Sequence, residues 1–505
     1  MENIDVSNSE VVNTLLNEKS ELGLIKKLCE QLNQNGINYC HWKSNATLDR
    51  SASGENDLDI LVSRLDGQRF VEILSRLGFK QVNKYSKFQL PGVVDYFGYD
   101  FTAERLVHVH THYQLVLGHD ATKNYHIPVE GPYIRSASQL GSFLVPSAEF
   151  ELIIFVIRMM IKHSTWDTIL LRQGKLSNSE QNELEYLLKL SSKIKIDEIL
   201  REHLPYLAPP LFAECLRILT SECSVWDHIQ VGQRLLNILV PFARQPQMVD
   251  SFLKFSRRVT IPLANRVFRR ELRMHINNGG LLVAIVGGDG AGKTTVVEEV
   301  YKWLSRNFEV HKFHMGKPNW SFPTILIRGI LKIGRTLGFY PYARAEYQYT
   351  NNPDSQVFPG YPSLIRGICT AHDRHITYRK ARCFATNGGV VLLDRFPIPQ
   401  IIFMEGPHLA RITADLPATR LLKFFINLEE GYYLKMALPD LLIVLRTDPE
   451  TAVLRKTDED QVSVRARSTE IWEMDWKQTP AYVIDANRSK EEVLLEVKQL
   501  IWTHL

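Results

Sequence analysis

A glycine-rich segment at residues 287–294, with the sequence GGDGAGKT, constrains the fold of this 505-residue chain more than any other feature. It matches the pattern G-x-x-x-x-G-K-[ST] at every fixed position. An apolar run at residues 281–286 precedes the segment, and a helical pattern follows it. We therefore predict a loop between a buried strand and a helix, in which backbone amides surround a polyphosphate.

The residue types of this segment suit a phosphate-binding loop. Glycine lacks a Cβ, so the backbone can approach the phosphates and adopt positive φ, and the following helix N-terminus adds a favourable dipole. Lys293 is predicted to contact the β- and γ-phosphates of ATP, and the Thr294 hydroxyl to ligate Mg²⁺. The predicted nucleotide-binding residues of the loop are Gly287, Gly288, Asp289, Gly290, Ala291, Gly292, Lys293, Thr294 and Thr295.

Further apolar runs follow the loop, at residues 390–393, 441–445 and 482–484. Continuous runs of this kind are typical of parallel strands that are buried on both faces. Helical patterns alternate with the runs, at residues 294–304, 449–456 and 489–502. The alternation predicts an α/β domain with a doubly wound parallel sheet over residues 279–505.

The chain before residue 279 has a different pattern. Residues 57–62 are predicted to form a strand, and residues 93–101 and 106–117 a β-hairpin. Helices are predicted at residues 21–34 and 67–77. From about residue 146 the pattern is almost wholly helical, with a buried helix at residues 152–161. We predict an α+β domain at residues 1–145 and a helical domain with a linker at residues 146–278.

Composition excludes several classes of protein. The chain has 60 basic and 56 acidic residues, a balance that does not indicate a nucleic-acid partner. Its six cysteines form no C-x-x-C pair, which is typical of reduced thiols rather than of a zinc site or disulfides. The first ten residues are acidic and polar, unlike a signal peptide, and no apolar run reaches about 18 residues. We expect a cytoplasmic protein.

Two basic amphipathic stretches, at residues 251–273 and 325–335, leave the question of membrane contact open. Each stretch fits an ordinary surface helix. Each also fits a helix that lies on an anionic membrane surface, because basic and apolar side chains share it. The oligomeric state is not decided by the sequence.

Four ordered motifs in residues 280–505 resemble the thymidylate kinase family. These are GGDGAGKTT with Asp289 inside the loop, AHDR at residues 371–374, a strand that ends in Asp394-Arg395-Phe396, and PDL…DPE…R at residues 439–455. The resemblance implies a P-loop kinase fold, phosphoryl transfer, and ATP and Mg²⁺ as cofactors.

The resemblance also implies roles for individual residues. Asp289 would face the acceptor, and Asp394 would lie near the metal at the carboxyl end of a strand. Arg374 and Arg395 would bind the acceptor, since a planar guanidinium suits a phosphate. The family's lid corresponds to Arg455, Arg465 and Arg467, and the resemblance implies that Arg455 binds the nucleotide. The predicted catalytic residues are Lys293, Asp394, Arg395, Asp289, Arg465 and Arg467, and the predicted metal ligands here are Thr294 and Asp394.

The chain departs from this family at the segment that reads the base. Residues 397–409, PIPQIIFMEGPHL with a turn at Glu405, lack the family's polar pattern, and a long aromatic and basic segment occupies residues 314–363. We therefore expect a phosphorylated or hydroxyl-bearing acceptor other than dTMP. A sugar or glycan fits this segment better than a nucleoside monophosphate-like acceptor does. Chains of this kind resemble proteins of surface-polysaccharide pathways.

A second set of motifs lies in the N-terminal half. HWKSN at residues 41–45 is followed by NDLDILV at residues 56–62 and LGF at residues 77–79. Asp57 and Asp59 alternate along a predicted strand, so both carboxylates point to one face and can hold a divalent cation. With PSAE at residues 146–149 and Lys162-His163, the set resembles the nucleotidyltransferase fold over residues 35–175.

This half departs from its family as well, because His108 stands where a third carboxylate is expected. His108, His110 and His112 share one face of a predicted strand, either as metal ligands or as partly buried polar residues. The leading hypothesis is an ATP-dependent kinase acting on a small-molecule or glycan acceptor. The alternatives are nucleotidyl transfer by the N-terminal half and an ATP-gated binding module in polysaccharide biosynthesis.

Overall fold

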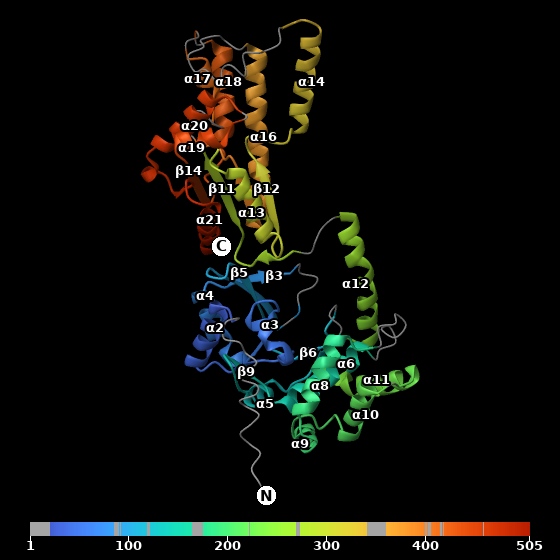
Figure 1. The fold of residues 1–505 in the computed structure, drawn as a ribbon. Coiled ribbons are helices and arrows are strands. Elements are labelled where there is room, and N and C mark those ends of the chain that lie inside the picture. Colours follow the sequence, from blue (N-terminus) through green and yellow to red (C-terminus); the bar gives the residue numbers. More distant parts are fainter. Residues whose placement is uncertain are drawn as a thin grey trace. The chain divides into compact units, whose positions relative to one another are not determined.

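The computed structural model describes residues 21–84, 90, 92–118, 122–163, 175–221, 223–268, 273–340, 360–398, 401, 406–414, 417, 419–457 and 459–505, with the backbone alone for residues 258–268. The chain forms two compact units that divide between residues 272 and 273 (Figure 1). Among the described residues, no helix is long and apolar enough to cross a membrane.

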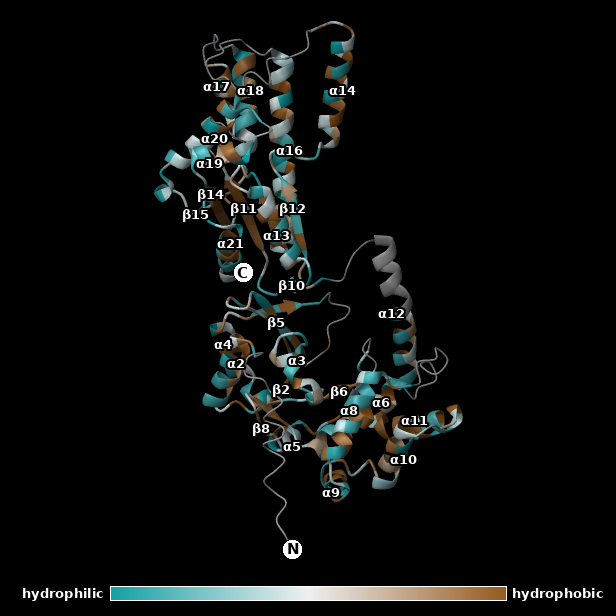
Figure 2. Ribbon diagram, in the orientation of Figure 1, coloured by the Kyte–Doolittle hydropathy of each residue, from teal (hydrophilic) through white to brown (hydrophobic). Residues whose placement is uncertain are grey.

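The second unit is built on a parallel sheet of five strands in the order β12-β13-β11-β14-β15. The central strand, β11 (Leu281–Gly287), is buried along its whole length. The other strands are β12 (Val310–His314), β13 (Val390–Asp394), β14 (Leu441–Arg446) and β15 (Ala481–Asp485). The central strands are apolar (Figure 2), because helices cover both of their faces. The predicted α/β domain with a parallel sheet is confirmed.

The helices of this unit pack on both faces of the sheet. Leu282, Ala284 and Val286 on β11 share a core with Tyr378 on α16 (Tyr361–Thr386). On the other side lie α13 (Lys293–Leu304) and α21 (Lys490–His504), which contact each other and the sheet. The remaining helices are α14 (Phe322–Thr336), α17 (Leu409–Ile412), α18 (Arg420–Tyr433), α19 (Pro449–Arg455), α20 (Gln461–Glu473) and the 3-10 turn η5 (Trp476–Gln478), and a short strand, β10 (His275–Ile276), precedes the sheet.

The first unit contains a mixed sheet with the strand order β1-β2-β5-β4-β3. The strands are β1 (Tyr39–His41), β2 (Leu58–Val62), β3 (Lys80–Asn83), β4 (Val93–Asp100) and β5 (Arg105–His112). β2 and β5 are parallel, and β4 and β5 form an antiparallel hairpin, as predicted. The register places Asp59 beside His110.

One face of this sheet is apolar and the other is polar. Leu58, Ile60 and Val62 pack against α2 (Gly23–Gln34) and α4 (Gly67–Arg76). Because side chains alternate along a strand, Asp59 and the histidines of β5 point to the opposite face. The short elements are η1 (Asn45–Thr47), α3 (Leu48–Ala52), η2 (Arg64–Asp66), β6 (Val116–Leu117), β7 (Tyr125–His126), α5 (Glu130–Arg135), β8 (Ser138–Leu140) and β9 (Phe143–Val145).

The helical part of the first unit surrounds α6 (Ala148–His163). This helix is buried at nearly every position, and its apolar side chains form the centre of the core. A helix that is hydrophobic all round belongs in the interior, so the prediction of a buried helix at residues 152–161 is confirmed. The surrounding helices are α8 (Asn178–Leu190), α9 (Lys193–His203), α10 (Pro209–Thr220), α11 (Val225–Leu239), η4 (Val240–Phe242) and α12 (Gln247–Phe268).

Candidate functional site

The glycine-rich loop joins the carboxyl end of β11 to the N-terminus of α13. Gly290 and Gly292 have φ angles of +76° and +83°, in the left-handed region that L side chains rarely adopt. A Cβ at Gly287 would lie 2.4 Å from the carbonyl oxygen of Leu445. Only glycine therefore fits at these positions of the loop. The loop leads directly into the N-terminus of α13, and a helix N-terminus favours anions.

Lys293 lies across the loop that precedes it. Its side chain is 5% exposed, and its Nζ donates a hydrogen bond of 2.6 Å to the carbonyl oxygen of Gly288. The same Nζ lies 3.9 Å from Oδ1 of Asp289. Thr294 and Thr295 follow on the first turn of α13 and are exposed. The loop thus carries a buried ammonium group with two accessible hydroxyls beside it.

Asp289 is a buried carboxylate held by two arginines from distant parts of the chain. Nη1 of Arg467, on α20, lies 2.5 Å from its Oδ2, and Nη2 of Arg395 lies 3.6 Å from its Oδ1. The Ser468 hydroxyl also donates to the Asp289 carbonyl at 3.2 Å. These contacts fix α20 against the loop and gather cationic groups around it.

Asp394 ends β13, beside Ile285 of β11. It is 5% exposed, and its Oδ1 is buried without a hydrogen-bond partner among the described residues. Its Oδ2 lies 3.9 Å from Nε2 of His314. A buried carboxylate oxygen without a partner is costly, so this atom fits a cation ligand, the role predicted for it with Thr294.

Arg395 has a φ of +64°, which is uncommon for a residue with a side chain. Such a conformation costs on the order of 1–3 kcal/mol and is found mainly at functional sites. In this conformation Arg395 donates its backbone N–H to the carbonyl of Ile285 at 3.2 Å. Its guanidinium reaches Asp289, so the strained residue connects two strand ends with the loop.

Arg374 lies on α16 and is 6% exposed. Its Nε donates to the carbonyl oxygen of Met315 at 2.9 Å, and its Nη1 donates to the Tyr433 hydroxyl at 2.6 Å. The N–H of Met315 in turn donates to the carbonyl of Asp394 at 2.8 Å. The predicted acceptor arginine is therefore two hydrogen bonds away from the predicted metal ligand.

Two of the predicted arginines contact other groups. Arg465 pairs with Glu450 between α20 and α19, and both side chains are at least half exposed. Arg455 donates to the carbonyl oxygen of Ala486 at 3.0 Å. Of the aromatic and basic segment at residues 314–363, residues 341–359 lie outside the described residues, and so does Glu405.

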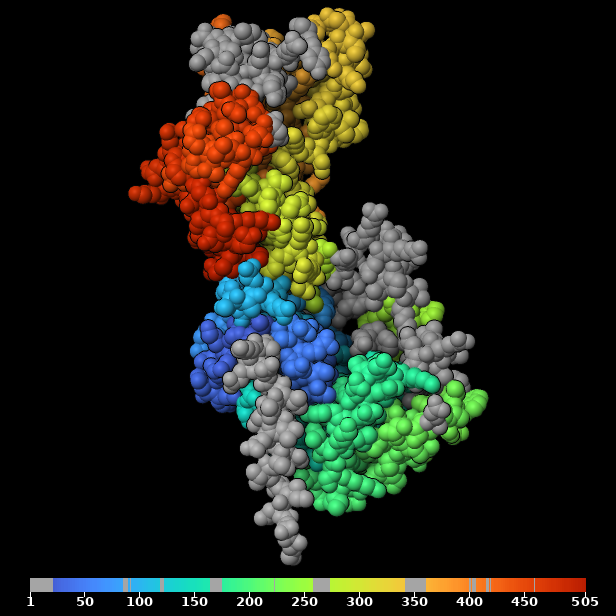
Figure 3. Space-filling view, in the orientation of Figure 1, coloured from blue at the N-terminus to red at the C-terminus, as the bar shows by residue number. Residues whose placement is uncertain are grey.

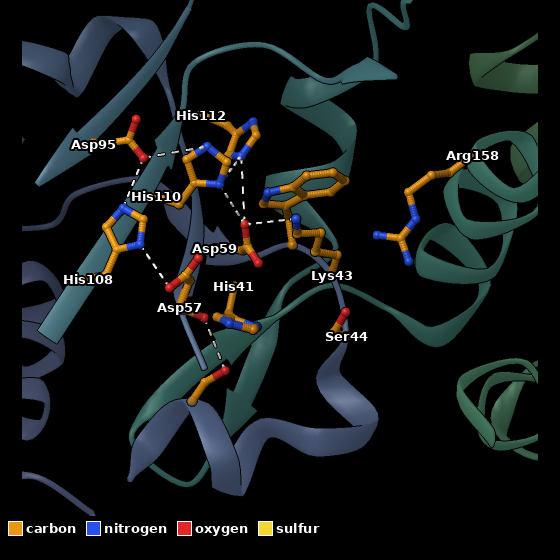
Figure 4. A network of polar contacts seen from close by, with 12 residues as sticks. His41, Lys43, Ser44, Asp57, Asp59, Asp95, His108, His110, His112 and Arg158 are labelled. Atoms are coloured by element: carbon orange, nitrogen blue, oxygen red, sulfur yellow. Dashed lines mark hydrogen bonds and ion pairs between the residues drawn. The ribbon is translucent and has the colours of Figure 1, made fainter. Parts of the chain in front are cut away.

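A second group of polar side chains lies on the polar face of the first unit's sheet (Figure 4). Lys43 Nζ lies 2.9 Å from Oδ1 of Asp59. His108 stands between two carboxylates, with Nδ1 2.8 Å from Asp57 and Nε2 2.9 Å from Asp95. Burial opposes the charging of His108, but hydrogen bonds to Asp57 and Asp95 outweigh it and raise the pKa of His108 to about 9.

Asp95 is a member of this group that the sequence analysis missed. It lies on β4, is 7% exposed, and also contacts Lys84 at 3.1 Å. Burial acts to raise its pKa, but the hydrogen bond from His108 and the charge of Lys84 hold the pKa well below its usual value. The alternation along residues 93–101 could have found Asp95, because Tyr96 belongs to the apolar face and Asp95 therefore to the other.

The comparisons with known proteins concern the C-terminal region. No protein-family profile matches the chain. It is 25% identical over 224 residues to the Escherichia coli K12 protein named "uncharacterized ATP-binding protein YghR", a match that covers 44% of this chain and 86% of YghR. It is also 25% identical over 218 residues to "uncharacterized ATP-binding protein YghS" from the same strain, covering 42% of this chain and 89% of YghS. The structure of deoxyadenosine kinase from M. mycoides with bound dATP matches 43% of this chain and 98% of that one, with 19% identity and a TM-score of 0.27.

Proposed function

We propose that the second unit is an ATP- and Mg²⁺-dependent kinase that transfers the γ-phosphoryl group to a phosphorylated or hydroxyl-bearing acceptor. The observation that carries the proposal is the loop at residues 287–294, with Lys293 folded over it and Asp289 held by two arginines. The names of the E. coli relatives, which describe ATP-binding proteins, support the choice of nucleotide.

Phosphoryl transfer requires that the reactants be positioned and that the charge on the phosphoryl group be stabilised, and it needs no covalent intermediate with the enzyme. An acceptor oxygen forms a bond with the γ-phosphorus while the bond to the bridging oxygen breaks, and ADP leaves with that oxygen. Lys293, Arg395 and Arg467 place three cations around the loop, where the charge of the transferring group develops. Thr294 and Asp394 are the proposed ligands of Mg²⁺, which when bound neutralises phosphate charge.

The acceptor is proposed to lie near Arg374 and Arg395. Arg374 is fixed by Met315 and Tyr433, so its guanidinium has a defined orientation before any ligand arrives. A fixed guanidinium suits a phosphate group. A sugar phosphate or glycan remains our preferred acceptor, because residues 397–409 lack the polar pattern that reads a base.

The test is a screen of acceptors with γ-labelled ATP, covering nucleoside monophosphates, sugar phosphates and lipid-linked glycans. Lys293→Ala should reduce transfer at least about 100-fold, in the range of losses seen when transition-state charge is left unstabilised. Lys302→Ala is the matched control, since Lys302 lies on the same helix with a 65% exposed side chain. Transfer by Lys293→Ala at the rate of the control would refute the kinase proposal.

A second candidate function, contact with an anionic membrane, is supported by α14. This helix lies at the surface of its unit (Figure 3) and carries no acidic residue, while Lys332 and Arg335 are basic. Five of its apolar side chains are more than half exposed: Phe322, Ile325, Leu326, Ile330 and Ile333. Basic residues beside an exposed apolar face are typical of interfacial helices.

Vesicle flotation tests this second candidate. The protein should float with phosphatidylglycerol vesicles at low salt and dissociate at high salt, because screening weakens the electrostatic part. The double substitution Ile330→Ser and Ile333→Ser should weaken binding, whereas Leu65→Ser, at a 94% exposed position of the first unit, should not. Absence of binding at low salt would reject the candidate.

A further inference from the structure

Three side chains on the polar face of the first unit's sheet bring one ligand atom each to a common point. Asp59 comes from β2, and His110 and His112 come from β5, which runs parallel to β2. Oδ1 of Asp59 lies 3.1 Å from Nδ1 of His110 and 3.8 Å from Nε2 of His112. The two imidazole nitrogens are 3.4 Å apart.

These separations match the spacing of ligands around a small metal ion. Zinc binds histidine nitrogen and carboxylate oxygen at about 2.0–2.1 Å, so ligands at tetrahedral angles lie about 3.3 Å from one another. The triangle in this structure, with sides of 3.1, 3.4 and 3.8 Å, brackets that value. A cation would therefore reach all three atoms with small movements of the side chains.

The three ligand side chains are largely shielded from solvent. The imidazole of His112 is fully buried, and the side chains of His110 and Asp59 are 14% and 13% exposed. Nδ1 of His112 is buried without a hydrogen-bond partner among the described residues, so Nε2 is the nitrogen that faces Asp59. A buried carboxylate beside two imidazoles is an arrangement that a bound cation would stabilise.

The next layer of contacts orients the two imidazoles. Oδ1 of Asp95 lies 3.8 Å from Nε2 of His110, too far for a hydrogen bond but close enough for the carboxylate charge to act on that ring. His108 holds Asp95 from the other side at 2.9 Å. The ring of His112 packs edge-on against Trp42, with ring centroids 5.0 Å apart. Figure 4 shows His110, His112 and Lys43 converging on Asp59, with Asp95 and His108 beside them.

We propose that Asp59, His110 and His112 form a binding site for Zn²⁺ or a divalent transition metal of similar preference. Two imidazoles and one carboxylate favour such an ion over Mg²⁺, which prefers oxygen ligands. Three protein ligands also leave a coordination position for water or a substrate. Asp57 is not part of this set. Its Oδ1 lies 2.8 Å from Nδ1 of His108, and His108 is not one of the three proposed ligands.

The ammonium group of Lys43 would compete with a metal ion for the carboxylate of Asp59. This group lies 2.9 Å from the same Oδ1 of Asp59 that the metal would use, so it neutralises the carboxylate in the absence of an ion. Metal binding must displace this contact. Lys43→Ala should therefore tighten binding several-fold, while the loss of any true ligand should weaken it.

The experiment uses the full chain without an affinity tag, stripped with a chelator and kept free of nucleotide. Co²⁺ titration should give visible ligand-field absorption that saturates at one equivalent, and Zn²⁺ should abolish it, whereas excess Mg²⁺ should not. Asp59→Asn and His110→Gln should each lower the Co²⁺ affinity at least about 10-fold. His126→Gln is the control, because His126 lies on β7 and pairs with Glu130 rather than with any member of this group; its Co²⁺ affinity should stay within a few-fold of the wild type.

Circular dichroism spectra establish that each variant is folded before titration. The proposal is overturned if the folded wild type gives no saturable Co²⁺ absorption, or if Asp59→Asn binds as tightly as the wild type. Should a ligand variant fail to fold, Lys43→Ala decides, because Lys43 is partly exposed and outside the ligand set. Tighter binding by Lys43→Ala supports the site, and unchanged or weaker binding contradicts it.

Discussion

Arg467 on α20 donates to the carboxylate of Asp289 at 2.5 Å, whereas Arg465, two residues earlier, pairs with Glu450 at the surface. Residues two positions apart on a helix do not share a face, so the two arginines have different environments. Of these two arginines of α20, Arg467 is the one that contacts the phosphate-binding loop. The pair therefore offers a matched test of which cation acts there.

Arg467→Ala should lower the rate of ATP-dependent transfer at least about 10-fold, because it removes a preorganised cation beside the loop. Arg465→Ala should stay within about two-fold of the wild type, since exposed ion pairs contribute little. Steady-state rates with saturating ATP measure both. Equal losses in the two variants would show that the contact with Asp289 has no special role.

We expect alanine substitutions at a glycine of the loop and at a glycine of α14 to have opposite effects on the free energy of unfolding. A Cβ at Gly290 would lie 2.7 Å from the carbonyl oxygen of Ala452, at a φ of +76°. Gly290→Ala should therefore lower the free energy of unfolding by about 2 kcal/mol or more. Gly329→Ala, within α14 and with nothing within 4 Å, should raise it by about 0.5–1 kcal/mol. Urea denaturation measures both, and a neutral Gly290→Ala would contradict the observed path of the loop.

Tyr433 and Tyr432 give a matched pair for the acceptor site. The Tyr433 hydroxyl accepts a hydrogen bond of 2.6 Å from Arg374, whereas the ring of Tyr432 packs near His372 and His375. Tyr433→Phe should raise the KM for the acceptor about 5–10-fold, as expected when a charged group loses one hydrogen bond, with little change in the KM for ATP. Tyr432→Phe should change neither value. An effect of Tyr433→Phe confined to ATP would argue against Arg374 as an acceptor ligand.

We expect His408 to make the free energy of unfolding fall in acid. Burial lowers its pKa to about 4 from a usual 6.5, and the charges of Arg374 and Arg411 act in the same direction. Between these two values the unfolded chain binds a proton that the folded chain does not, so stability falls as the pH drops from 6.5 to 4. The contribution of this group reaches about 3 kcal/mol.

The substitution His408→Gln should remove that part of the acid sensitivity. Urea midpoints of the wild type and the variant, compared at pH 7 and pH 4.5, measure the difference. The wild type should lose more stability than the variant over this interval. Identical losses would mean that His408 is accessible to protons in the folded state.

The sequence allowed prediction of the elements that are buried on both sides. β11, β13 and β14 are continuous apolar runs because neighbouring strands and helices enclose them. β12 was not predicted, because its alternating residues Val310–His314 are half exposed at the edge of the sheet and give no apolar run. Pattern reasoning therefore found the three central strands and the edge strand β15, whose run at residues 482–484 was predicted, and it missed the other edge strand, β12.

The candidate sites follow the same division between local and long-range information. The loop and Lys293 were predictable because the motif is local. The partner of Asp289 was not, since the choice between Arg465 and Arg467 depends on how α20 is rotated against the loop. In the first unit, the register that pairs Asp59 with His110 rather than with His108 is likewise a property of the assembled sheet.

The order of strands has a consequence for synthesis on the ribosome. β11 emerges first among the five strands, yet both of its neighbours, β13 and β14, are translated only after α16. Until β13 and β14 have been synthesised, the apolar strand β11 has no pairing partners in the nascent chain and is prone to aggregation. We expect chaperones to engage this chain between the translation of the phosphate loop and that of β14, and ribosome profiling of chaperone-bound nascent chains would show it.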